Sequence, residues 1–287
     1  MNSALHPRTL LVLGRVANLP TVWSNCLAGW WLGGGGNGWK LPFLFLGVSL
    51  LHTGGMFLND AFDADFDRQR RLERPIPSGK ISAQLVWRLG FGQLGMGIFL
   101  LLFCGQMAVG AAFFLALFIL FYNFSHRFFT ASPWLMGACR FWIYAGAGAT
   151  GATGLNGWPI FCGLALAFYV AGAGYVARRG NSRAIIPHWP LLLLATPVIL
   201  AIAMNTGSFR LRAIGISALV ILWMGRCVRT VFQPGAINAG RTVAGLMAGI
   251  VLVDWLAVAP VCPFWLGAMF PVLFGATLLL QKLAPTV

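Results

Sequence analysis

The 287-residue sequence contains only six acidic residues, and five of them lie within one window of 14 residues. If this window is helical, Asn59, Asp63 and Asp67 recur every four residues and share one face. Asp60 lies between them on that face, whereas Asp65 points away. Three or four oxygen ligands on one face suit Mg²⁺, which commonly joins carboxylates to substrate phosphates. The spacing therefore predicts a Mg²⁺ site made by Asn59, Asp60, Asp63 and Asp67.

Arginines follow the acidic residues directly, at positions 68, 70, 71 and 74. Guanidinium groups bind phosphate oxygens in a planar, two-pronged geometry, so we expect Arg70 and Arg74 to contact a diphosphate beside the metal. The alternative is a solvated loop of mixed charge, which is common at membrane surfaces. The helical spacing, the neighbouring Asn59 and the scarcity of acids elsewhere favour the metal site.

The sequence as a whole is strongly apolar, with 59% hydrophobic and 9% charged residues and a mean hydropathy of +0.79. A soluble domain cannot hide that much apolar surface, whereas a bilayer can. Ten segments approach the length of about 20 residues that a spanning helix needs. They lie near 10–32, 41–59, 82–104, 107–124, 134–152, 157–177, 189–205, 211–229, 242–260 and 263–281. A proline-rich joint at 260–263 separates the last two, so we predict one all-α domain over residues 1–287, a membrane bundle of nine or ten helices.

The basic residues predict how the chain is oriented. With a cytoplasmic N-terminus, sixteen Lys and Arg fall on the cytoplasmic side and three on the other, as the positive-inside rule requires. We therefore expect a multi-pass protein of the bacterial inner membrane whose acid-rich loop is cytoplasmic. The net charge of +14 then faces anionic lipid, and no basic helix or stacking platform points to nucleic acid.

A family resemblance rests on the acid-rich segment. The segment reads NDxxDxxxD and then RxxxRPxPSGxxS, with the matching residues Asn59, Asp60, Asp63, Asp67, Arg70, Arg74, Pro75, Pro77, Ser78, Gly79 and Ser82. In motif, spacing and position after the second apolar segment, it resembles the first signature of the UbiA superfamily of intramembrane prenyltransferases. Further similarity is found at Arg15, Pro20 and Asn25, at Tyr122–Arg127 and at Met136–Arg140.

The resemblance implies a bundle of usually nine helices around a cavity that opens toward lipid. In such proteins, Mg²⁺ and two aspartate-rich motifs bind a polyprenyl diphosphate, whose ionisation gives an allylic cation that an aromatic acceptor captures. Metal and arginines would stabilise the leaving diphosphate, and the apolar cavity would shelter the cation from water. The motif implies that Asp60, Asp63 and Asp67 are the catalytic acids.

Other roles follow from the resemblance by position. His126 and Arg127 stand at the end of the fourth apolar segment, where the family often has YxxxK, and are expected to contact the diphosphate. Tyr122 in the same segment and Asn25 in the first are expected to bind the acceptor. His126 replaces the family's lysine, which is one departure from the pattern.

A second departure concerns the family's second aspartate-rich motif, which belongs after the sixth apolar segment. Residues 174–183 occupy that place and contain no acid. Arg178 and Arg179, with Arg183, could instead neutralise the diphosphate directly, or they could only reflect the positive-inside rule. The pattern looks most like the EboC-like branch of the superfamily, which is associated with secondary metabolism.

Two functions are therefore kept. The leading one is an enzyme that transfers a prenyl group from a polyprenyl diphosphate to a small, aromatic acceptor within the membrane. The alternative is a catalytically impaired relative that binds a hydrophobic metabolite or helps its traffic across the membrane. Two further polar residues lie within apolar segments. His52 is expected to be a packed polar residue, with lining of the cavity as the alternative, and Asp254 is expected to pair with Arg241 or another basic group in a structural role.

Overall fold

The computed structural model describes residues 7–36, 38–179, 188–229 and 239–283, and every regular element in these ranges is helical. The helices are α1 (Pro7–Leu13), α2 (Leu19–Leu32), α3 (Leu41–Phe62), α4 (Ala64–Arg70), α5 (Ala83–Leu101), α6 (Gln106–Ser125), α7 (Ser132–Thr150), α8 (Gly157–Arg179), α9 (Trp189–Met204), α10 (Ser208–Arg229), α11 (Ala239–Val258) and α12 (Phe264–Leu283). Short 3₁₀ turns cover Val16–Asn18, Gly38–Lys40 and Leu102–Cys104. The all-α prediction is confirmed.

Seven helices in the described ranges are long and apolar enough to cross a membrane: α3, α5, α6, α8, α10, α11 and α12. The apolar helix α9 has 16 residues and α2 has 14, which is short for a span. These helices support a multi-pass membrane protein. The total of nine or ten spans and the cytoplasmic N-terminus remain predictions.

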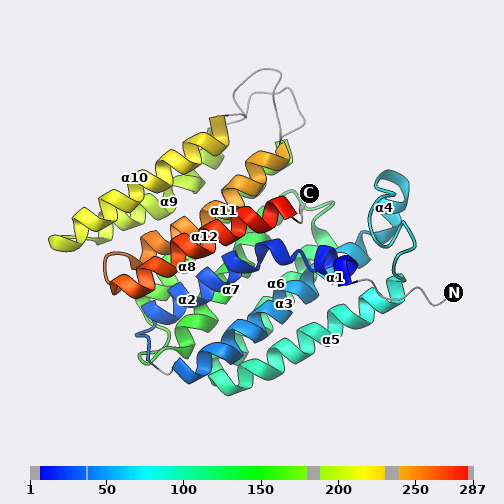
Figure 1. The fold of residues 1–287 in the computed structure, drawn as a ribbon, viewed down its shortest axis with the longest axis horizontal. Coiled ribbons are helices and arrows are strands. Elements are labelled where there is room, and N and C mark those ends of the chain that lie inside the picture. Colours follow the sequence, from blue (N-terminus) through cyan, green and yellow to red (C-terminus); the bar gives the residue numbers. More distant parts are fainter. Residues whose placement is uncertain (1–6, 37, 180–187, 230–238, 284–287) are drawn as a thin grey trace.

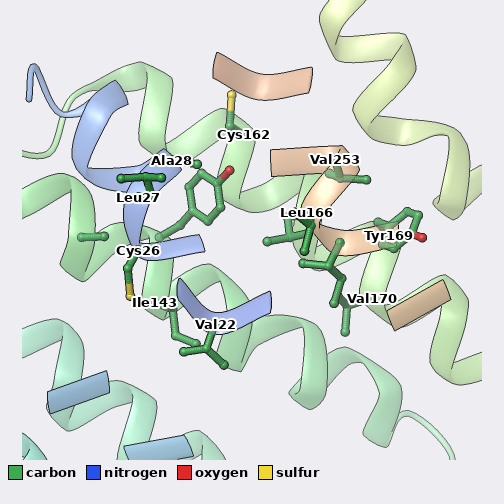
Figure 2. Packing of buried hydrophobic residues seen from close by; sticks show 14 of the residues in the cluster. Val22, Cys26, Leu27, Ala28, Ile143, Cys162, Leu166, Tyr169, Val170 and Val253 are labelled. Carbon is green, nitrogen blue, oxygen red and sulfur yellow. The ribbon is translucent and has the colours of Figure 1, made fainter. Parts of the chain in front are cut away.

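The centre of the bundle is built by α2, α7, α8 and α11, which pack on one another in pairs. Figure 2 shows Val22 of α2, Ile143 of α7, Leu166 of α8 and Val253 of α11 among the side chains of this core. Glycine permits the closest approach, because a Cβ on Gly33 would lie 2.1 Å from the backbone oxygen of Gly148. In lipid, the hydrophobic effect does not drive helices together, so close packing through small residues such as these glycines stabilises the bundle.

The acid-rich α4 lies at one end of the bundle, and the first residues of α10 and α12 lie at the opposite end (Figure 1). Helix α1 lies at the α4 end of the bundle (Figure 1). There the first apolar segment differs from the prediction, because it is broken at Arg15 rather than continuous. Arg15 has φ 44°, the left-handed region that non-glycine residues rarely adopt, and Pro20 lies in the first turn of α2. This break turns the Arg15 side chain toward the acidic residues.

Candidate functional site

The backbone of the acidic segment stays helical through the join of α3 and α4. Asp63, the residue between them, has φ −84° and ψ −6°, within the right-handed region. Its N–H donates to the backbone oxygen of Asn59 at 3.0 Å, and that of Asp67 donates to Asp63 at 2.9 Å. The helical frame expected from the spacing is therefore present, and the three side chains follow one another at four-residue intervals.

Asp60 and Asp67 are joined by a single arginine. Nη1 of Arg74 lies 3.1 Å from Oδ1 of Asp60 and 3.0 Å from Oδ2 of Asp67. The Asp67 side chain is 2% exposed and the Asp60 side chain 11%, so both carboxylates are held away from water. Arg74 reaches them from the turn that follows α4. One cationic nitrogen thus occupies the position between two carboxylates.

Asp63 has different partners, which come from the end of α6. Nη2 and Nε of Arg127 lie 2.6 and 2.8 Å from its Oδ1, and Nε2 of His126 lies 3.3 Å away. Partial burial acts to raise the pKa of the Asp63 carboxyl. The hydrogen bond and electrostatic interaction with His126, together with Arg127, outweigh burial and lower that pKa below its ordinary value.

Asn59 belongs to a polar chain rather than to the carboxylate pair. Arg15 Nη2 donates to Asn59 Oδ1 at 3.0 Å and lies 3.7 Å from Asp60. The Asn59 amide donates to Asn123 Oδ1 at 3.1 Å, and Asn123 donates to the backbone oxygen of Gly55 at 3.0 Å. Asn123, which the sequence interpretation passed over, therefore joins α6 to α3 beside the site. Its only sequence signal is its place within the Tyr122–Arg127 segment.

Aromatic rings flank the charged groups. The rings of Tyr122 and His126 stack with centroids 5.3 Å apart, and His126 Nδ1 lies 3.1 Å from the backbone oxygen of Asn123. Phe66 of α4 lies under two guanidinium groups, those of Arg127 at 4.6 Å and Arg70 at 4.8 Å. This cation–π contact adds a second means of holding Arg127 beside the acids.

Asp65 lies apart from these contacts, as its helical position predicts. Its side chain is 90% exposed and pairs with Arg68, whose Nη1 is 2.5 Å away. An exposed pair of this kind contributes little to stability. A substitution of Asp65 is therefore a suitable control for substitutions of the neighbouring, buried acids.

Arg178 organises the loop between α6 and α7. Its guanidinium donates to the backbone oxygens of His126 and Thr130 at 2.8 Å and of Phe129 at 3.0 Å, and to Ser132 Oγ at 2.7 Å. A cation at the end of α6 also complements the helix dipole. In this conformation Arg178 thus supports the backbone of His126. The side chains of Arg179 and Arg183 lie outside the described residues.

The donor atoms fit Mg²⁺ in kind, because carboxylate oxygens of Asp60 and Asp67 converge on one cation position. Arg74 now holds that position, so a metal ion and this guanidinium would compete for it. Across the described ranges, no three His, Cys, Asp or Glu side chains are grouped as a ready-made ligand set. The acids are instead divided between Arg74 and Arg127.

The sixth acid, Asp254, lies inside the bundle and is fully buried. It accepts hydrogen bonds from Ser24 Oγ, from Asn25 Nδ2 at 2.6 Å and from the Tyr144 hydroxyl at 2.9 Å. The other end of the Asn25 amide accepts from Arg140 Nη1 at 2.7 Å. Asp254 is therefore linked to a basic residue, Arg140, through Asn25. Both ends of the Asn25 amide are used within this network.

The predicted site residues thus fall into three groups. Asn59, Asp60, Asp63, Asp67, Arg74, His126 and Arg127 gather at the ends of α3 and α6, with Tyr122 and Arg70 beside them. Arg178 stands behind the loop that carries His126. Asn25 lies deeper, among the buried groups of α2, α7 and α11. The assigned roles remain predictions.

A membrane bundle with an acid- and arginine-rich end is the class of protein that this fold and site define. A sequence model described as the UbiA prenyltransferase family matches residues 17–284, and the chain belongs to that family. This confirms the resemblance drawn from the acid-rich segment.

Curated relatives match over shorter stretches. The chain is 34% identical to a digeranylgeranylglyceryl phosphate synthase of Metallosphaera sedula over 83 residues, 29% of each chain. It is 32% identical to a 4-hydroxybenzoate octaprenyltransferase of Acidovorax ebreus over 146 residues, 47% of this chain and 50% of the relative. The matched part is thus half or less of each relative.

A solved structure shows the same fold. It comes from work described as structural and mechanistic insights into the biosynthesis of digeranylgeranylglyceryl phosphate synthase in membranes. The TM-score is 0.65 at 19% sequence identity, over 90% of this chain and 98% of that chain.

Proposed function

We propose that this protein transfers a prenyl group from a polyprenyl diphosphate to a small, aromatic or cyclic acceptor within the membrane. The observation that carries the proposal is the convergence of Asp60, Asp63 and Asp67 with basic residues at one end of an apolar bundle. Membership of the UbiA prenyltransferase family supports it. The names of the curated relatives are consistent with prenyl transfer, with different acceptors.

Each charged residue has a task in this proposal. Asp60 and Asp67, with Asp63 and Asn59 nearby, would hold Mg²⁺, which would supply positive charge to the leaving diphosphate. With the metal held by the two carboxylates, the guanidinium of Arg74 would be free to bind the phosphate oxygens. The planar guanidinium group can bind phosphate oxygens as well as it binds carboxylates.

The residues at the end of α6 complete the diphosphate site. Arg127 and His126 contact the phosphate oxygens from the side of Asp63, and Arg178 keeps the loop that carries His126 in place. Beyond them, the apolar helices exclude water from the allylic cation. Tyr122, stacked on His126, faces the acceptor. We place the protein in a bacterial inner membrane with this site on the cytoplasmic side, and its product in secondary metabolism.

A second function is favoured by two features of the charged residues. The segment at 174–183 contains no acid, and the acids of the first motif are already neutralised by Arg74 and Arg127. A site whose acids are already neutralised by arginines would bind a hydrophobic metabolite without catalysing a reaction on it. In that case, the protein would help the metabolite's traffic across the membrane.

Diphosphate release separates the two functions. The full-length protein in lipid nanodiscs is supplied with Mg²⁺ and prenyl diphosphates of several chain lengths, beside the variants Asp63→Asn and Asp65→Asn. We expect release by the wild type and by Asp65→Asn, because Asp65 is exposed and outside the cluster. Asp63→Asn should lower the rate at least about a hundredfold. Binding of the prenyl diphosphate without release by any protein would favour the carrier.

A further inference from the structure

An apolar groove is lined by residues of the first turns of α10 and α12 and of the end of α11. These parts of the three helices lie at the end of the bundle opposite the acid-rich α4 (Figure 1). Its volume is about 680 Å³, within the range of roughly 300–1,000 Å³ of small-molecule sites. Ile216, Trp255, Phe264 and Pro271 contribute to its walls. Arg212 is the one charged side chain that lines it. The groove is therefore separate from the proposed catalytic site and differs from it in charge.

Arg212 has no acidic partner among the residues that the structure describes. All six acids lie in the described ranges, and five of them belong to the acid-rich segment at the other end. The sixth, Asp254, is buried and accepts hydrogen bonds from Ser24, Asn25 and Tyr144. Arg212 is exposed and forms none of the ion pairs within the described residues. Its charge is left for an anion from outside the chain.

We propose that this groove binds an acidic phospholipid, with an acyl chain against α10, α11 and α12 and the headgroup phosphate on Arg212. The apolar walls account for the tail and the unpaired guanidinium accounts for the phosphate. The position also fits, because Arg212 lies in the second turn of α10, where a spanning helix meets the headgroups. A free anion would gain nothing from the apolar walls, and a zwitterionic lipid would gain less from Arg212, because its own cation offsets the charge of its phosphate.

Two glycines of α10 have open space at the Cβ position, and one of them lines the groove. A Cβ added to Gly215, which lines the groove, would meet nothing within 4 Å. A Cβ on Gly225 of the same helix would also meet nothing within 4 Å, and Gly225 does not line the groove. Leucine is a better helix former than glycine at both positions. Gly215→Leu therefore places side-chain atoms in the space of the acyl chain, and Gly225→Leu is its matched control.

The charge has a matched control too. Arg210 lies two residues before Arg212, is also exposed and does not line the groove. Arg210→Gln and Arg212→Gln remove the same charge from the same end of the bundle. A difference between them isolates the groove from the general attraction of basic residues for an anionic bilayer.

The test is native mass spectrometry of the full-length protein in neutral detergent, titrated with phosphatidylglycerol, phosphatidylcholine of the same acyl chains, or inorganic phosphate. We expect phosphatidylglycerol to bind several-fold tighter than phosphatidylcholine, and inorganic phosphate to show no saturable binding. Arg212→Gln should weaken phosphatidylglycerol binding about fivefold or more, and Arg210→Gln less than twofold. Gly215→Leu, but not Gly225→Leu, should weaken the binding of both lipids.

Three results would overturn the proposal. Equal effects of Arg210→Gln and Arg212→Gln would show a general electrostatic attraction. Saturable binding of inorganic phosphate as tight as that of phosphatidylglycerol would show a free-anion site. Unchanged lipid binding by Gly215→Leu would show that the acyl chain lies elsewhere. Because Arg212 is exposed, its substitution leaves the folded bundle available for the measurement.

Discussion

Arg127 holds Asp63 through two nitrogens, Nη2 at 2.6 Å and Nε at 2.8 Å from the same carboxylate oxygen. The pair joins the end of α6 to the end of α3 across 64 residues of sequence. A guanidinium held in this manner is already oriented when a phosphate arrives, so the contact both stabilises the site and prepares it.

Stability should fall in acid through Asp63. Its pKa in the folded protein lies below the ordinary value of 3.8, so the ion pair stabilises the fold above that value. The contribution is lost as the pH falls below 3.8 through the folded pKa, because the carboxyl becomes protonated. Thermal unfolding of the wild type between pH 3 and 7 should therefore show a steeper loss at the acidic end than that of Asp63→Asn. Parallel curves for the two proteins would rule out this role.

Arg74 should be replaceable by a divalent cation. Arg74→Ala leaves the carboxylates of Asp60 and Asp67 without their shared cation, and we expect a loss of about 3 kcal/mol in the free energy of unfolding. Mg²⁺ should restore part of the melting temperature of Arg74→Ala and have less effect on the wild type. The control is Arg68→Ala, which breaks only the exposed pair with Asp65. An equal response of both variants to Mg²⁺ would argue against a metal site here.

Arg140 and Asp254 should be strongly coupled, although they do not touch. Asn25 links them inside the bundle, so removing either charge leaves the other buried and uncompensated. Arg140→Met and Asp254→Asn should each cost about 3–5 kcal/mol, and the double variant much less than their sum. A double-mutant cycle on the free energy of unfolding measures the coupling. Additive costs would mean that the network does not bridge the two charges.

Arg178 should act on the loop rather than only on the substrate. Arg178→Ala removes donors to the backbone of His126, Phe129 and Thr130, so amide exchange in residues 126–132 should speed up without any ligand. The exposed Arg88 of α5 provides the control, Arg88→Ala. If exchange is unchanged and only diphosphate binding is weakened, Arg178 contacts the substrate directly. That outcome would contradict the structural role.

The helices and the acid-rich segment could be predicted from the sequence, because both depend on residue patterns within one stretch of the chain. Asp63 and Asp67 stack because four residues make about one helical turn, and no tertiary information is needed. The basic partners of these acids could not be predicted in the same way. Arg74 lies close to them in sequence but its choice of Asp60 and Asp67 depends on how the chain turns after α4.

Contacts between distant segments could not be read from the sequence. Asn25 and Asp254 meet across 229 residues, and Arg140 reaches Asn25 across 115. Nothing local marks Asp254 as a partner of α2 and α7, so the sequence left its basic partner open. The break at Arg15 was not predicted, because a left-handed backbone at a non-glycine residue has no local sequence signal.

The central claim is prenyl transfer, and following the prenyl group tests it most directly. The purified protein in nanodiscs is incubated with Mg²⁺, an isotope-labelled prenyl diphosphate and a panel of small aromatic acceptors, and the products are separated by mass spectrometry. We predict label covalently attached to an acceptor by the wild type and by Asp65→Asn, and none by Asp63→Asn. Label found only in intact prenyl diphosphate, bound equally by all three proteins, would contradict an enzymatic role.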